Sequence, residues 1–317
     1  LVGTCLWPER FIRTAVLWLC RKVDKPILKL TYQDYIDNRL GQLLEATGQT
    51  YDMINIQVFN DLQHTISGWP GGKPNADDST RPERATPYPK RVLIFSPHPD
   101  DDVISMGGTF IRLIAQGHDV HVAYQTSGNI AVLDDIVLQT LDTARECGFV
   151  DRYNEVQEII NNKKKGEAEP IELRRLKGSI RRAEAKAACR QMGLTDPSHV
   201  HFLNLPFYET GGVKKGLLTD KDIQIVVDLL REIKPHQIYA AGDLSDPHGT
   251  HRVCIEAVLA AMEVVQDEEW VKECRLWLYR GAWQEWDLDM VDMAVPLSPD
   301  EVIQKRHAIY RHLSQKD

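Results

Sequence analysis

The sequence lacks the features that mark a membrane-spanning or disulfide-stabilised protein. The longest apolar run near its start, residues 15–20, is flanked by basic residues and is far too short to cross a bilayer. The six cysteines include no C-x-x-C pair, and most lie in helix-like apolar patterns, where cysteine acts as a small hydrophobic residue. We therefore expect a cytoplasmic protein with no membrane partner.

The chain also lacks an excess of positive charge. Its 46 acidic and 38 basic residues give a net charge of −8, which argues against nucleic acid as a partner. With 317 residues and 43% hydrophobic content it can bury a large core, sufficient for one generous domain or for one domain with an additional piece. The chain starts without Met in the middle of a well-formed pattern, so we expect it to be part of a longer protein.

Proline, glycine and small polar residues are concentrated in residues 68–89, which we predict to be a linker. Residues 1–67 precede it, with a helix expected over 7–20, a short strand over 25–30 and an amphipathic helix over 32–47. These elements are too few for an independent core. Residues 90–317 follow the linker and form the second predicted domain.

Short apolar strands alternate with helices throughout residues 90–317. The predicted strands cover 91–96, 119–125, 199–205, 236–241 and 275–280, and the predicted helices cover 103–116, 131–147, 171–193, 219–233, 250–265 and 299–313. Such alternation is typical of an α/β fold, here a three-layer Rossmann-like, mostly parallel sheet with helices on both faces. Ligands of such folds bind at the carboxyl ends of the strands, near the switch in strand order.

The stretch "FSPHPDDDVISMGG", residues 95–108, places one histidine and three consecutive aspartates directly after the first of these strands. A divalent metal would relieve the repulsion among the carboxylates. Zinc suits His98 and Asp101, provided that a third protein ligand is supplied from elsewhere and water fills the fourth position. The alternative is a helix N-terminus, which attracts carboxylates without any metal.

The third ligand should be a histidine at the carboxyl end of another strand. His118 and His121 flank the start of a strand, and His199 and His201 enter another strand at its amino end, so we interpret both pairs as structural. The segment "GDLSDPHGTHR", residues 242–252, instead follows a strand and opens a helix.

His248 and His251 of this segment therefore emerge at the same edge of the sheet as His98 and Asp101, which favours the metal interpretation. A further stretch at the end of a strand, "QTSGN" at 125–129, could either donate hydrogen bonds to a sugar or form a plain turn.

These motifs resemble those of the LmbE/PIG-L family of zinc-dependent N-acetylglucosamine deacetylases. "PHPDDD" with the following G-G-T is similar to the family's A-H-P-D-D-E, and "DPHGTHR" is similar to its H-x-x-H. "RRAEAKAACRQMG" and "KRHAIYRHLSQ" resemble the family's R-x-x-E helix and C-terminal H-x-S-Q. The family's final Glu is Asp102 here, and its residue before the first histidine is Pro97.

The resemblance covers roughly residues 90–315 and implies a role for several residues. His98, Asp101 and His251 would bind zinc, although iron, cobalt or nickel could occupy the same ligands. Asp100 would act as the general base, His248 would stabilise or protonate the transition state, and Arg181 would contact the sugar. The implied reaction is removal of the N-acetyl group from an N-acetylglucosamine-type sugar, with or without a 6-phosphate.

Residues 1–67 resemble the tail of a glucosamine-6-phosphate deaminase-like protein that carries a C-terminal LmbE-type domain. The full-length protein would then hold an N-terminal deaminase-like module and take part in amino-sugar metabolism. One alternative is deaminase or isomerase chemistry, and another is a sugar-binding or accessory module with an idle metal site. The sequence leaves the oligomeric state open, with a homo-oligomer among the options.

Overall fold

The structure is a computed structural model that describes residues 8–62, 89–149, 153–164, 167–295 and 297–316. Its contacts divide the chain into two compact units. The first consists of the described residues of Leu1–Tyr88 together with Trp286–Ser298, and the second of those of Pro89–Glu285 together with Pro299–Asp317. The predicted linker, 68–89, lies outside the described residues except for its last residue.

The first unit is helical. Its elements are α1 (Glu9–Val23), the 3₁₀ helix η1 (Ile27–Lys29), α2 (Tyr32–Asp37), α3 (Gly41–Thr47), α4 (Tyr51–Leu62) and the 3₁₀ helix η6 (Leu288–Met290). Apolar residues of these helices form one buried cluster around Tyr35, whose hydroxyl donates to Asn55 Oδ1 over 2.7 Å. The unit thus has a core of its own, contrary to the expectation that its elements are too few.

Part of this core comes from a distant segment of the chain. Val291 and Ala294 pack against the cluster, and the Ala294 N–H donates to the Leu62 carbonyl over 2.8 Å. The stretch Trp286–Ser298, which lies inside the predicted domain 90–317, therefore packs with the N-terminal helices. That residues 1–67 derive from a sugar isomerase/deaminase-like domain stays a prediction.

Two local predictions in this unit were wrong. The predicted strand at 25–30 is the 3₁₀ turn η1, in which the Lys29 N–H donates to the Pro26 carbonyl, because no neighbouring strand is available for pairing among the described residues of the unit. The predicted helix 32–47 is divided into α2 and α3 at Arg39, whose φ of 62° is left-handed.

The second unit is built on a five-stranded sheet in which every described pairing is parallel. The strands are β1 (Arg91–Ser96), β2 (Asp119–Tyr124), β3 (Val200–Phe202), β4 (Gln237–Ala241) and β5 (Arg275–Tyr279), in the order β3-β2-β1-β4-β5. The chain runs outward from β1 through β2 to β3 and then returns to the other side of β1. The switch point of the sheet consequently lies between β1 and β4.

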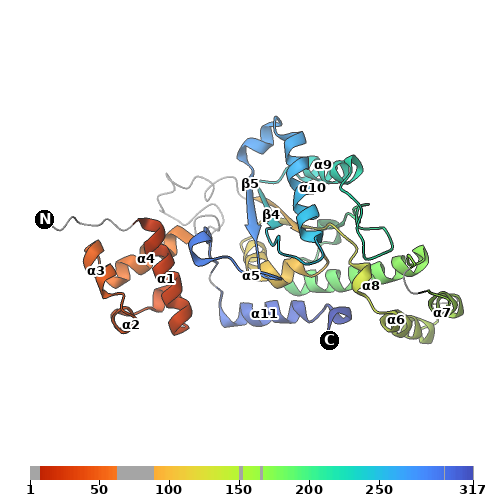
Figure 1. Ribbon diagram of the computed structural model, residues 1–317, viewed down its shortest axis with the longest axis horizontal. Coiled ribbons are helices and arrows are strands. Elements are labelled where there is room, and N and C mark those ends of the chain that lie inside the picture. The colour runs from red at the N-terminus through yellow and green to blue at the C-terminus, as the bar shows by residue number, and fades with distance from the viewer. Residues whose placement is uncertain (1–7, 63–88, 150–152, 165–166, 296, 317) are drawn as a thin grey trace. The chain divides into compact units, whose positions relative to one another are not determined.

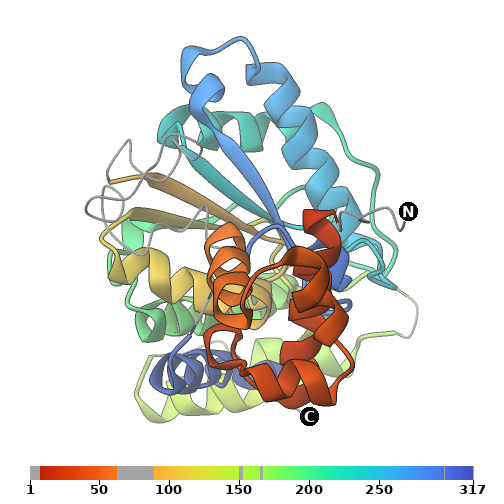
Figure 2. The same cartoon turned by 90° about the vertical axis from the view of Figure 1, so that its left-hand side faces the viewer.

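Helices cover both faces of this sheet, as predicted (Figures 1 and 2). They are α5 (Asp101–Ala115), α6 (Asp134–Glu146), α7 (Tyr153–Asn161), α8 (Ile171–Met192), α9 (Asp220–Ile233), α10 (Thr250–Val265) and α11 (Pro299–Ile309). α9 and α10 share a core cluster with Leu93, Ala123 and Ile238 of the strands. Tyr124 follows Ala123 and so points to the other face, where its hydroxyl lies 3.2 Å from Cys189 Sγ of α8.

The architecture predicted from the sequence is therefore confirmed, with boundaries within a few residues for most of its elements. α7 was not predicted from the sequence, because the segment between the predicted helices 131–147 and 171–193 is polar and was interpreted as an insertion. It packs with α6 and α8 around Val156 and Leu173 in a small cluster of its own. In the described part of the chain, no helix combines the length and the apolar character that crossing a bilayer requires.

Candidate metal centre

His98 and Asp101 lie where β1 ends and α5 begins. The turn between them is closed by the Asp100 N–H, which donates to the His98 carbonyl over 2.8 Å. Asp101 is the first residue of α5, and its Oδ2 accepts the backbone N–H of His98 over 2.9 Å. The tight H-P-D-D turn therefore holds the imidazole and the carboxylate side by side.

His251 comes from the first turn of α10, which follows β4. Asp246 shapes this turn, since its two carboxylate oxygens accept the backbone N–H groups of His248 (2.8 Å) and His251 (3.0 Å). Burial alone would raise the pKa of Asp246, but these backbone hydrogen bonds outweigh it and lower the pKa. An ionised carboxylate thus fixes the loop that carries both histidines.

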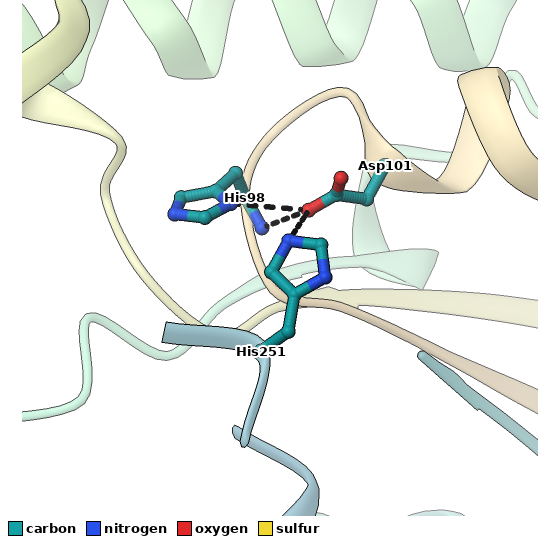
Figure 3. Close-up of side chains that lie close together, drawn as sticks. All are labelled: His98, Asp101 and His251. Atoms are coloured by element: carbon teal, nitrogen blue, oxygen red, sulfur yellow. Dashed lines mark hydrogen bonds and ion pairs between the residues drawn. The ribbon is translucent and has the colours of Figure 1, made fainter. Parts of the chain in front are cut away.

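The three side chains converge on one point (Figure 3). His98 Nδ1 and His251 Nε2 each lie 3.2 Å from Asp101 Oδ2. Ligands bound at about 2.0–2.1 Å to a tetrahedral zinc ion are about 3.3 Å apart, so these separations fit such an ion. His251 is 1% exposed, and its Nδ1 has no hydrogen-bond partner in the described part of the chain.

The electrostatics of the three groups are those of a cation site. Burial would raise the pKa of Asp101, but the interactions with His251 and His98 outweigh burial and keep the carboxylate ionised. Two nitrogens and one carboxylate oxygen, with space left for a fourth ligand, form the donor set of a catalytic zinc site. The residues present therefore fit the metal that the sequence predicts.

Asp100 does not behave as a helix cap. It occupies the N-cap position of α5, but its side chain makes no cap hydrogen bond. Its Oδ2 instead lies 3.1 Å from Nη2 of Arg181 on α8, and the same nitrogen donates to the Pro99 carbonyl over 3.3 Å. Arg181 is 1% exposed, and its Nε and Nη1 have no hydrogen-bond partner in the described residues.

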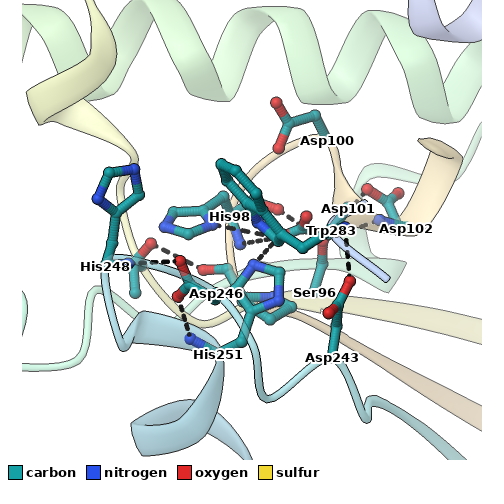
Figure 4. Close-up of polar contacts among 12 residues, drawn as sticks. Ser96, His98, Asp100, Asp101, Asp102, Asp243, Asp246, His248, His251 and Trp283 are labelled. Carbon is teal, nitrogen blue, oxygen red and sulfur yellow. Dashed lines mark hydrogen bonds and ion pairs between the residues drawn. The ribbon is translucent and has the colours of Figure 1, made fainter. Parts of the chain in front are cut away.

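Asp102 has contacts that differ from those of the other two carboxylates (Figure 4). It is fully buried, accepts a hydrogen bond from the Tyr124 hydroxyl over 3.0 Å, and lies beside Ser96. Burial, aided by the charges of Asp100 and Asp101, raises the pKa of Asp102 to about 7. This residue stands where the resembling family has Glu, and its contacts are those of a structural group.

His248 is separate from the three convergent residues and lies near Trp283, with ring centroids 5.8 Å apart (Figure 4). Trp283 is held by Asp243, whose Oδ2 accepts the backbone N–H groups of Trp283 and Gln284 over 2.6 and 3.0 Å. Asp243 and Asp246 both belong to the segment 242–252, in which only the histidines were predicted as site residues.

A cavity of about 700 Å³ opens over these groups. Most of the predicted site residues line it: His98, Asp100, Asp101, Arg181 and His248. His251 is buried behind this lining, next to Thr250, which does line the cavity. Tyr208, Lys215, Trp283 and Gln315 also line it and were missed, because they lie in loops or in a motif with no recognisable metal chemistry.

Most side chains of the stretch 125–129 form hydrogen bonds within the protein, so few donors remain for a sugar. Gln125 and Thr126 hydrogen-bond to backbone carbonyls, and Asn129 donates to Glu209 over 3.0 Å. Gly128 has a φ of +63°, and a Cβ there would lie 3.0 Å from both Arg181 Nε and the Pro99 ring. Glycine at this position therefore allows Arg181 to approach the H-P-D-D turn closely.

The two other motifs of the sequence interlock beside the site. Glu184, three residues after Arg181 on α8, accepts hydrogen bonds from the backbone N–H and the hydroxyl of Ser314 over 2.6 and 2.7 Å. His312 lies in the same buried segment, and burial lowers its pKa to about 4. The R-x-x-E helix and the H-x-S-Q segment thus form one buried contact that supports Arg181.

Several known proteins are similar to this chain. A glucosamine-6-phosphate deaminase-like protein of Bacteroides thetaiotaomicron is 53% identical over 329 residues, which is 100% of this chain and 49% of that protein. The structure of N,N'-diacetylchitobiose deacetylase from Pyrococcus horikoshii has 20% identity and a TM-score of 0.47, over 72% of this chain and 71% of that one. The 4-carboxy-2-hydroxymuconate hydratase of Pseudomonas putida has 18% identity and a TM-score of 0.40, over 71% and 83%.

This chain spans about half the length of the curated relative that it matches. The family model that matches is PIG-L, described as GlcNAc-PI de-N-acetylase, and it aligns with residues 93–262, more than half of the chain. That range begins inside β1 and ends inside α10, so it contains His98, Asp101 and His251. The chain therefore belongs to the PIG-L (LmbE-like) family of deacetylases.

Proposed function

We propose that the chain is a metal-dependent hydrolase that removes the N-acetyl group from an N-acetylglucosamine-type sugar. The observation that carries this proposal is the convergence of His98, Asp101 and His251 at the switch point of the sheet, in a chain of the PIG-L family. Two of these residues, His98 and Asp101, line a cavity. A cavity of about 700 Å³ is within the range of small-molecule sites and large enough for an amino sugar.

His98, Asp101 and His251 would hold the metal, with zinc as the ion best suited to two imidazoles and one carboxylate. When bound, such an ion supplies Lewis acidity toward the amide carbonyl and lowers the pKa of a coordinated water to about 7. The assignment of zinc is part of the proposal, because iron, cobalt and nickel accept the same ligands.

Asp100 is the proposed general base. Its carboxylate lines the cavity next to the ligand Asp101, and it can take a proton from a water positioned there. Arg181, 3.1 Å from Asp100, keeps that carboxylate oriented toward the cavity. Arg181 lines the cavity, and two of its guanidinium nitrogens have no hydrogen-bond partner among the described residues, which supports its proposed contact with the sugar.

His248 is the proposed acid on the other side of the reaction centre. It lies at the rim of the cavity on the loop fixed by Asp246, so it can donate a proton to the departing amine or to the oxyanion. Its separation from the three convergent residues supports a role in catalysis outside metal binding (Figure 4).

The test measures acetate and ammonia released from N-acetylglucosamine and from its 6-phosphate by zinc-reconstituted protein. We expect acetate release that is lost in His251→Ala, because this change removes one of only three protein ligands. His307→Ala is the matched control, since His307 is exposed on α11 and lies outside the cavity lining. Undiminished metal content and activity in His251→Ala would disprove the site.

The same assay separates the rival functions. The name of the Bacteroides relative favours deaminase or isomerase chemistry for the longer protein. That chemistry needs a free amine, so it predicts ammonia release from glucosamine 6-phosphate, added as a third substrate, and no acetate release from the two N-acetylated sugars. A sugar-binding or accessory module predicts tight sugar binding with neither product. Comparing the two sugars also shows whether a 6-phosphate is required.

A further inference from the structure

A second group of imidazoles and carboxylates lies at the amino ends of β2 and β3. His121 Nε2 is 3.3 Å from Asp119 Oδ1, and His199 Nδ1 is 3.6 Å from the same oxygen. The rings of His121 and His199 are stacked, with centroids 4.1 Å apart. These histidines were interpreted from the sequence as structural, in two separate pairs, and their convergence with Asp119 was not foreseen.

Strand geometry explains the convergence. Asp119 and His121 are two residues apart on β2, so both side chains point to one face of the sheet. Ala123 lies on this face too and is paired with His201 of β3, which places His201 diagonally opposite His121. His199 directly precedes β3 and completes the group.

We propose that Asp119, His121 and His199 form a second binding site for a divalent transition metal ion, distinct from the catalytic centre. One atom from each residue lies within 4.8 Å of the others, and the separations of 3.3 and 3.6 Å match the ~3.3 Å expected between ligands of tetrahedral zinc. Two imidazoles and one carboxylate are a donor set suited to Zn²⁺, Ni²⁺ or Cu²⁺.

One proposed imidazole ligand, His121, has an outer hydrogen-bond partner for its second ring nitrogen. His121 Nδ1 lies 3.0 Å from His201 Nε2, so it can donate a proton to His201 and leave Nε2 free to bind the ion. His199 Nε2 faces the carboxylate of Asp196 at 3.9 Å, which is an electrostatic contact longer than a hydrogen bond. Such outer partners fix the orientation of ligand histidines in metal sites, and plain surface histidines do not need them.

The group can also be reached by an ion from solvent. The side chains of Asp119, His121 and His199 are 37%, 14% and 27% exposed. A bound ion would join the segment before β3, the edge strand, to β2.

The test counts Zn²⁺ bound per chain by equilibrium dialysis and elemental analysis. The double variant His121→Gln/His199→Gln keeps neutral side chains that can form hydrogen bonds. It is made in two parent proteins, the wild type and His98→Ala/His251→Ala, and each variant is compared with its own parent. We expect the variant to bind one ion fewer than its parent in both backgrounds. The comparison is therefore independent of whether the catalytic site binds zinc.

Two further measurements keep the result unambiguous. His307→Gln, which alters an exposed histidine on α11, should bind as much zinc as its parent. Zn²⁺ should raise the melting temperature of His98→Ala/His251→Ala, and the added His121→Gln/His199→Gln changes should abolish this rise. Equal zinc content in variant and parent, or an equal loss in His307→Gln, would overturn the proposal.

Discussion

Replacing Asp100 by asparagine is the most informative single change in this site. The change removes one charge and one proton acceptor but preserves the shape of the side chain. Asp100 is not a metal ligand in the proposed site, so Asp100→Asn should retain the metal. If Asp100 is the general base, as proposed, turnover needs it, and we expect the rate to fall by about 10²- to 10⁴-fold.

The structure adds a stability cost to this prediction. Arg181 is 2% exposed at its side chain and has Asp100 as its carboxylate partner at 3.1 Å. An asparagine oxygen can still accept a hydrogen bond, but the buried guanidinium loses its counter-charge, which costs about 1–3 kcal/mol. In a unit of about 200 residues this corresponds to a fall in melting temperature of roughly 3–10 °C.

The assay combines metal content, melting temperature and the pH dependence of kcat/KM for acetate release. Protonation of a general base produces the fall in kcat/KM at low pH, the acidic limb of the profile. Asp100→Asn should therefore flatten this limb as well as lower the rate. If Asp100 only orients Arg181, the same change would lower the rate and leave the acidic limb in place. Asp220→Asn, at the exposed start of α9, controls for loss of charge at a helix N-terminus. Near-parental turnover in Asp100→Asn would remove this residue from the mechanism.

Three further outcomes test other parts of the second unit. Gly128→Ala should lower the activity about 10-fold or more, because the added methyl group would lie 3.0 Å from both the Arg181 guanidinium and the Pro99 ring. The metal should be retained. Steady-state kinetics measure the activity, and elemental analysis measures the metal content. Glu184→Ala should destabilise the unit by about 1–3 kcal/mol, because the buried backbone N–H of Ser314 loses its acceptor. Ser314→Ala should cost less, because it removes only the hydroxyl that donates to Glu184. Denaturant titration measures the free energy of unfolding of both variants. Burial lowers the pKa of His118 and His236 to about 4 in the folded state, so the folded state binds fewer protons than the unfolded state between about pH 6.5 and 4. Stability should therefore fall as the pH drops through that window, and the fall should be smaller in His118→Gln/His236→Gln, as followed by melting curves.

The predictable part of the fold rests on strong, regular patterns. β1 and β4 are short runs of apolar residues bounded by polar turns, and both strands were predicted to within one residue of their bounds. The H-P-D-D turn and the segment 242–252 follow those strands directly. The rule that ligands lie at the carboxyl edge of a parallel sheet was therefore enough to predict from the amino-acid order that His98 and His251 share one edge.

The features that escaped prediction depend on contacts between distant segments. The backbone N–H of Trp283 donates a hydrogen bond to Asp243, forty residues earlier, and no local sequence pattern predicts that hydrogen bond. The return of Trp286–Ser298 to the N-terminal helices is similarly set by packing of Val291 and Ala294. A strand at 25–30 was expected because "KPILKL" is apolar and short, but a strand needs a partner, and the first unit offers none in its described residues.

Three adjacent carboxylates can coexist after β1 because the fold gives each a different partner. Asp100 faces a buried guanidinium, Asp101 faces two imidazoles, and Asp102 meets the Tyr124 hydroxyl in a buried pocket where its pKa rises to about 7. Asp101 is held in its ionised form by imidazoles, which carry no permanent charge, so a bound cation is favoured at this position above the other two. A cation bound there would also offset the repulsion that Asp101 exerts on Asp100 and Asp102, so the proposed base, the proposed metal ligand and the buried acid could follow one another in a single turn of chain.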